Sequence, residues 1–213
     1  MATGNANSTV RTSYRHGDLR RALIEAGVDL AREGGPAAVV LREATRRAGV
    51  TPNAAYRHFA DRQALLDAVC SSCQALVAYS IEADQAQVTT TDPVEAARLR
   101  FRAVGTGYLR FALEQPGQFQ TAFSASSDME SATSSARAGA SGLTPFQLLS
   151  QALDDLVTVR LLPPERRPAA EFLAWSSVHG LAELFIDGPL RALPDAVKQT
   201  LIVRVIDMVE KGL

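Results

Sequence analysis

Residues 41–58 combine a tight turn with side chains suited to contacting a nucleic acid. Gly49 can adopt a positive φ between two short helical patterns, and Val50 can fill the angle between them. Asn53 and Ala54 follow the turn and are short enough to let a helix enter a DNA major groove. This pattern predicts a helix-turn-helix motif, although a helical hairpin that binds nothing would share it.

Hydrophobic spacing before the turn predicts the helices that position it. Apolar residues recur at intervals of four, three and four residues, which is one face of a helix: Leu19, Leu23, Ala26 and Leu30. Glycines at 34 and 35 and proline at 36 end this helix, because glycine allows a left-handed cap and proline cannot continue it. A second short helix is expected over residues 41–48.

Capping residues mark the two helices that follow the turn. Thr51 is an N-cap residue and Pro52 suits the first helical position, so a third helix begins there and ends near Phe59. Asp61 caps a fourth helix, whose apolar residues continue to Val77.

The remaining chain is also helical in pattern. Helices are expected at about 93–114, 117–125, 144–162, 168–187 and 194–211, each closed by Gly, Pro or polar residues. Because no stretch alternates at a period of two, the predicted fold is all-α with about nine helices. Residues 1–13 are small and polar and predict a flexible arm, and the low-complexity segment 124–142 is expected to be mobile.

Composition limits the class of protein. The 213 residues are 46% hydrophobic and 21% charged, which is enough to bury a core. No run approaches 18 apolar residues and the N-terminus lacks an apolar signal region, so we expect a cytoplasmic protein without a membrane span. Residues 1–62 carry ten Arg and no Lys against six Asp and Glu, a net +4, whereas the remainder carries −5. A basic head on an acidic body suggests that the head alone meets a polyanion, unless the clustering is chance.

Two cysteines are too few for a disulfide scaffold or a structural zinc site. Cys70 and Cys73 lie three residues apart on the fourth helix, where a thiol sensor is conceivable. Two small apolar packing residues are the favoured interpretation. We expect no metal and no cofactor.

Residues 16–66 resemble the DNA-binding domain of the TetR/AcrR family of transcriptional regulators. The resemblance is carried by LREATRRAGVTPNAAYRHFADRQALL, in which Gly49-Val50, Tyr56, His58-Phe59 and Leu65 stand where the family has them. The later stretch WSSVHG, residues 175–180, is similar to the Trp-x-x-x-His-Gly motif of one subgroup's C-terminal domain.

The resemblance implies roles for individual residues in DNA binding. Positions that hold DNA phosphates are matched by Thr51, Tyr56, His58 and Arg62. Positions that face base edges are matched by Arg42, Pro52, Asn53, Ala54 and Arg57. Arg42 would read guanine and Asn53 adenine, while Arg15 and His16 would reach a neighbouring phosphate or the minor groove. Each arginine could instead be a solvated surface charge.

The sequence departs from the family pattern at two places. Val39 and Val40 stand where Ser or Thr often caps the first helix of the motif, a loss of about 1 kcal/mol. Arg62 replaces the usual lysine at the start of the fourth helix, which keeps the charge but changes its geometry.

In the family, the remaining helices bind a small molecule and form a homodimer. An aromatic-rich set drawn from several helices fits an apolar pocket: Phe101, Val104, Tyr108, Phe111, Phe119, Phe123, Phe146, Leu149, Leu153 and Trp175. Tyr108, Gln147 and His179 are candidate polar anchors. The alternative is that these residues form an ordinary core, with His179 in that core or near a dimer seam.

The last two helices carry more apolar surface than one small bundle needs, and by resemblance they pair with those of a second copy. The dimer residues are expected to include Leu181, Leu184, Phe185, Leu201 and Val205. Such a two-fold dimer would place its recognition helices in successive major grooves of a roughly palindromic operator.

The chain is therefore expected to have an arm (1–13), a DNA-binding domain (14–62) and a ligand-binding and dimerisation domain (63–213). The expected function is a ligand-responsive transcriptional regulator, most often a repressor in this family, whose partners are double-stranded operator DNA, a small effector and a second copy. An architectural DNA binder without effector is the alternative. An enzyme is disfavoured, because the sequence shows no nucleophile–base pair, phosphate loop or metal-ligand spacing.

Overall fold

The computed structural model describes residues 16–124 and 129–213. The expected arm over 1–13, Arg15 and the part of the low-complexity segment at 125–128 lie outside the described residues, as does the side chain of His16. The described part of the chain is all-α with nine α-helices, which confirms the predicted fold class.

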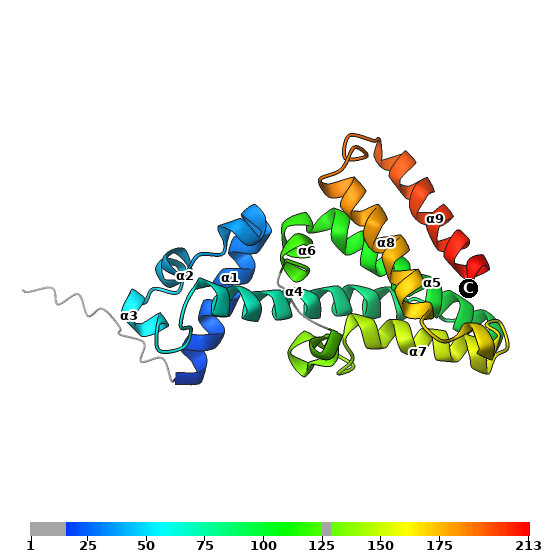
Figure 1. Ribbon diagram of the computed structural model, residues 1–213, viewed down its shortest axis with the longest axis horizontal. Helices are drawn as coiled ribbons and strands as arrows, with labels where there is room; N and C mark the ends of the chain where they lie inside the picture. The colour runs from blue at the N-terminus through cyan, green and yellow to red at the C-terminus, as the bar shows by residue number, and fades with distance from the viewer. Residues whose placement is uncertain (1–15, 125–128) are drawn as a thin grey trace, which may run out of the picture.

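The helices form a head at one end of a long connecting helix and a body around its other end (Figure 1). The head contains α1 (His16–Ala38), α2 (Leu41–Arg47) and α3 (Pro52–Ala55), and the connecting helix is α4 (Arg62–Gln85). The body adds α5 (Pro93–Glu114), α6 (Pro116–Ala122), α7 (Pro145–Thr158), α8 (Ala170–Ile186) and α9 (Asp195–Gly212). Three short 3-10 helices, η1 (Met129–Thr133), η2 (Ser135–Arg137) and η3 (Pro164–Arg166), lie in the loops.

Most turns and helix starts of the head lie where its glycines and caps predict, but α3 ends at Ala55 rather than near Phe59, and its N-cap Thr51 makes no side-chain hydrogen bond. Helical geometry breaks at Gly34 and at Gly35, whose φ is +63°, and a last turn follows through Pro36 to Ala38. Gly49 turns the chain from α2 to α3 with a φ of +68°. The Asp61 carboxylate caps α4 by accepting from the Ala64 N–H at 2.8 Å. Val40 caps α2 without a side-chain hydrogen bond, as the sequence indicates.

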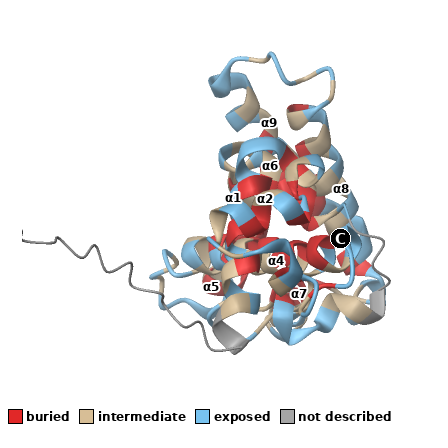
Figure 2. Cartoon of the chain, turned by 90° about the vertical axis from the view of Figure 1, so that its left-hand side faces the viewer, coloured by how far each residue is buried: buried red, intermediate tan, exposed pale blue. Residues whose placement is uncertain are grey.

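Helix α4 forms part of the core of both the head and the body. Its length and mean hydropathy of 1.4 are enough to cross a membrane, but 56% of that apolar stretch is buried inside the protein. The buried residues in Figure 2 cluster along α4 and its neighbours. Cys70 and Cys73 lie among them, and burial raises the pKa of the Cys73 thiol to about 12. A neutral buried thiol fits the packing role better than a sensor role.

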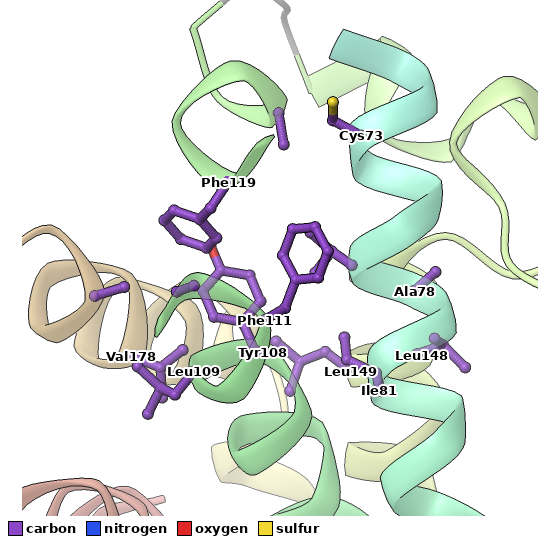
Figure 3. Packing of buried hydrophobic residues seen from close by; sticks show 14 of the residues in the cluster. Cys73, Ala78, Ile81, Tyr108, Leu109, Phe111, Phe119, Leu148, Leu149 and Val178 are labelled. Carbon is purple, nitrogen blue, oxygen red and sulfur yellow. The ribbon is translucent and has the colours of Figure 1, made fainter. Parts of the chain in front are cut away.

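Helix α5 packs very closely on α4. A Cβ on Gly107 would lie 2.7 Å from the Ile81 Cα, so only glycine allows this approach. The Ser80 hydroxyl donates to the Gly107 carbonyl at 2.8 Å across the same contact. Figure 3 shows Ile81 of α4 near the aromatic residues of α5 and α6.

The later helices depart from the predicted ends by up to four residues. Helix α6 ends at Ala122 rather than 125, and α7 ends at Thr158 rather than 162. The second difference arises because the backbone turns at Arg160, whose φ is +61°.

The described part of the low-complexity segment has regular local structure. It forms η1 and η2, and the backbone N–H groups of Ala140 and Ser141 donate to the Glu82 carboxylate at 2.8 and 2.9 Å. Its mobility stays a prediction, but this anchoring fixes η2 against α4 beside the interior of the body.

Candidate nucleic-acid interface and ligand cavity

The residues predicted to meet DNA come together on α2, α3 and the turn after α3. Helix α3 lies at the end of the molecule farthest from α8 and α9 (Figure 1). Ala55 and Phe59 are buried and hold this helix to the head, while the following side chains are exposed: Arg42, Thr51, Pro52, Asn53, Tyr56 and Arg57. Ala54 and His58 are half-buried. Tyr56 is 58% exposed, so its side chain is accessible at this surface.

The arginines of the head fall into two groups, those that form ion pairs and those that form none with a described residue. Arg46 and Arg47 bind the Glu43 carboxylate at 2.6 and 3.3 Å, and Arg47 also binds Glu33 at 2.6 Å. The Arg46 and Arg47 guanidinium groups hold the pKa of Glu43 down at about 2. By contrast, Arg42 and Arg57 form no ion pair with any described residue, so their guanidinium groups are available for DNA.

Arg62 has a structural task that the sequence did not indicate. Its Nε donates to the Val39 carbonyl at 2.8 Å, and one terminal nitrogen donates to the Pro36 carbonyl at 2.7 Å. These bonds tie the start of α4 to the chain that enters α2. The guanidinium fork suits two carbonyls through two different nitrogens, and the Arg62 side chain has further N–H donors beyond these two bonds.

The body encloses a cavity of about 530 Å³. Eight of the twelve residues predicted as pocket residues or polar anchors line it: Phe101, Val104, Tyr108, Phe123, Phe146, Leu149, Trp175 and His179. Leu153 does not line it and is fully buried. Phe111 and Phe119 are instead buried beside it, and the Phe119 ring packs edge-on against Tyr108 with centroids 5.2 Å apart (Figure 3). Gln147 does not line the cavity, because its side chain accepts from the Thr144 N–H and caps α7.

A polar network joins α5 and α8 in the cavity wall. Trp175 Nε1 donates to the Tyr108 hydroxyl at 3.1 Å, and that hydroxyl lies 2.8 Å from His179 Nδ1. Burial lowers the pKa of His179 and raises the pKa of Tyr108 well above its usual value, so both side chains are neutral at neutral pH. Neutral His179 accepts at Nδ1 and the tyrosine donates, so the Tyr108 hydroxyl both donates and accepts, while His179 Nε2 lies 4.0 Å from a Glu183 carboxylate oxygen.

Several lining residues were not anticipated from the sequence. They include Gln74, Ile81, Ala132, Arg137, Phe172 and Ile206. Arg137 is the most unusual of them, because it is an arginine only 7% exposed whose Nε has no hydrogen-bond partner. It lies in the Ser- and Ala-rich segment, where no periodic pattern marks a buried residue.

The residues predicted for a dimer seam differ in their exposure. Leu184 is 42% exposed, Leu181, Leu201 and Val205 are half-buried, and Phe185 is buried inside the protomer at 3%. Further exposed apolar side chains on the same two helices are Leu173 on α8 and Val197, Val203 and Met208 on α9. Helices α8 and α9 lie side by side at the outside of the body (Figure 1), so these side chains give it an apolar outer surface.

Comparisons with known proteins agree with this arrangement. The family described as "Bacterial regulatory proteins, tetR family" matches residues 23–69, and the one described as "Tetracyclin repressor-like, C-terminal domain" matches residues 101–209. No curated protein sequence matches the chain.

Solved structures share the fold over nearly the whole chain. A protein of unknown function from Rhodococcus sp. RHA1 is 24% identical with a TM-score of 0.71, covering 95% of this chain and 99% of that one. The fatty acid degradation regulator FadR from Bacillus halodurans is 14% identical with a TM-score of 0.60, covering 91% and 98%. RolR in complex with resorcinol is 19% identical with a TM-score of 0.58, covering 91% and 88%.

Proposed function

This chain belongs to the TetR family of transcriptional regulators, and from that premise we propose that it is a repressor that a small apolar or aromatic effector releases from a palindromic operator. DNA binding resides in residues 14–62, and effector binding and dimerisation in residues 63–213. The protein acts in the cytoplasm and needs no cofactor. The single observation that carries the effector response is the 530 Å³ aromatic cavity in the body.

Helix α6 supplies the contact between that cavity and the head. At its C-terminal end the Ala122 carbonyl accepts from Gln74 Nε2 at 2.7 Å, and Gln74 lines the cavity. Phe123, the residue after α6, lines the cavity and packs against His179 with ring centroids 5.0 Å apart. An effector that displaces Phe123 therefore pushes on α6.

The N-terminal end of α6 is pressed against the end of α1. A Cβ on Gly117 would lie 2.3 Å from the Ala31 carbonyl oxygen, so the two backbones are already in contact. Gln118, which is fully buried, donates to the Val28 carbonyl of α1 at 3.3 Å. A shift of α6 is transmitted to α1 and thereby to α3. A coupling of about 1–3 kcal/mol would change DNA affinity by about 5–150-fold.

The apolar surface of α8 and α9 supports a homodimer. In this proposal Leu181, Leu184, Leu201 and Val205 contact the same surface of a second copy, while Phe185 supports α8 from inside. Two-fold symmetry then places two heads on two half-sites about one helical turn apart.

An architectural DNA binder without effector remains the second candidate from the sequence. The cavity disfavours it, because a purely architectural protein would fill this space with side chains. An enzyme is excluded by the family, whose members are regulators.

DNA selection with the full chain tests the proposed function. Duplexes enriched from a random pool should contain a two-fold symmetric sequence. Arg42→Ala should lose about 5–150-fold of its preference for that operator over a scrambled duplex, since a base contact is worth about 1–3 kcal/mol. Tyr56→Ala should weaken binding to both duplexes equally, because a phosphate contact carries no sequence information.

Arg46→Ala is the matched control, because Arg46 lies on the same helix but is paired with Glu43. Its operator affinity should stay close to that of the unmodified protein. Failure to enrich any symmetric sequence would contradict the proposal, as would an equal loss on both duplexes in Arg42→Ala.

A further inference from the structure

Arg137 presents a positive charge inside the body of the protein. It is the last residue of η2, and its backbone N–H donates to the Ser134 carbonyl at 2.9 Å, which fixes its position. The residue is more than nine-tenths buried and lines the cavity. Its Nε has no hydrogen-bond partner, and the guanidinium forms no ion pair with any side chain that the structure describes.

The loop that follows η2 already engages one carboxylate of α4. Glu82 of α4 accepts from the backbone N–H groups of Ala140 and Ser141, just beyond η2. The loop therefore uses this carboxylate to hold its own backbone, and Arg137 receives no counter-charge from it. A buried charge without a partner is costly, so proteins place one where something else supplies the opposite charge.

The other polar groups of the cavity wall have partners. Hydrogen bonds join Tyr108 to Trp175 and to His179, and the Gln74 amide donates to the Ala122 carbonyl. Among the lining residues Arg137 alone carries a formal charge at neutral pH, since burial lowers the pKa of His179. The cavity thus offers apolar walls and one unpaired cation.

We infer that the cavity binds an apolar monocarboxylate whose carboxylate group pairs with the guanidinium of Arg137. This inference rests on the proposed function in taking the cavity as the effector site. The planar guanidinium fork matches a carboxylate in bidentate geometry. One cation balances a single negative charge, whereas a phosphate dianion would leave a second charge buried and unpaired. The rings of Phe101, Phe146 and Phe172 receive the apolar body of the ligand.

Calorimetric titration of the full chain with matched probes tests the inference. The probes are decanoate and 2-naphthoate, each paired with its neutral amide. The unmodified protein should bind at least one carboxylate about tenfold or more tightly than its amide, a typical gain for a charge-assisted pair. Arg137→Met should abolish this preference, and Arg137→Lys should keep part of it. Arg100→Met, which removes an exposed arginine of α5, should behave like the unmodified protein.

Thermal unfolding without any probe separates a ligand-binding arginine from a structural one. Arg137→Met should unfold at the same temperature as the unmodified protein or higher, because it removes an uncompensated buried charge. A clear fall in the unfolding temperature would show that Arg137 has a partner within the protein and would overturn the inference. Equal affinity for carboxylate and amide, a preference retained in Arg137→Met, or no binding of either carboxylate would also overturn it.

Measuring operator affinity in the presence of each probe distinguishes failure of this inference from failure of the proposed function. If the bound carboxylate leaves operator affinity unchanged, the carboxylate site stands and the proposed release mechanism falls. If a neutral molecule releases the operator while neither carboxylate binds, the regulator stands and the role of Arg137 falls.

Discussion

Leu184→Glu should convert the dimer to a monomer and lower operator affinity by about a hundredfold or more, since a monomer loses the second half-site. Leu184 is exposed on α8, on the outer apolar surface of the body. In a two-fold dimer each substitution appears twice about the axis. Two carboxylates would be buried facing apolar side chains and each other, which costs several kcal/mol.

Val94→Glu is the matched control, because Val94 is exposed to the same extent but belongs to α5 rather than to α8 or α9. It should leave both the oligomeric state and operator affinity unchanged. Light scattering reports the mass, and fluorescence anisotropy of a labelled operator reports binding. A Leu184→Glu protein that remains a dimer, or an unmodified protein that is a monomer, would refute the dimer arrangement.

Gly117→Ala should mimic the effector by forcing α6 away from α1. Its Cβ would lie 2.3 Å from the Ala31 carbonyl oxygen and 3.1 Å from that of Arg32. Both are backbone atoms, so no side chain can rotate aside and the helices themselves must separate. We expect operator affinity to fall by about 5–150-fold without any ligand, the range of a typical allosteric coupling.

The control for this substitution is Gly212→Ala, whose added methyl group meets nothing within 4 Å. Circular dichroism should show the full helix content in both variants, although overpacking at Gly117 lowers stability by about 1–3 kcal/mol. If Gly117→Ala is folded, binds the operator with unchanged affinity and still responds to ligand, α6 does not couple the cavity to the head.

The sequence predicts where a helix begins or turns wherever neighbouring residues alone decide that position. Asp61 and the glycines at 35 and 49 act through their own backbone or their immediate neighbours, so their roles can be predicted without the fold. Arg62 is different, because its two carbonyl partners lie 23 and 26 residues earlier in the chain. Only the folded head brings these groups together.

The cavity was predicted in composition but not in detail. Helical spacing could not separate Phe123, which lines the cavity, from Phe119, which is buried behind it, because both come from α6 and its end. Helix α8 is apolar around most of its circumference, so periodicity did not reveal that Phe185 points inward while Leu184 points out. No pattern in the sequence indicates that Arg137 is buried, because its burial depends on the contact by which Glu82 fixes the neighbouring loop.

One titration tests most directly whether cavity and head are coupled. Trp175 is the only tryptophan of the chain and lies in the cavity wall, so its emission reports occupancy. A labelled operator in the same cuvette reports DNA binding by its anisotropy. For the first apolar carboxylate or alcohol that changes Trp175 emission, the proposed mechanism predicts that anisotropy falls over the same concentration range. Complete change of Trp175 emission with the operator still fully bound would contradict it.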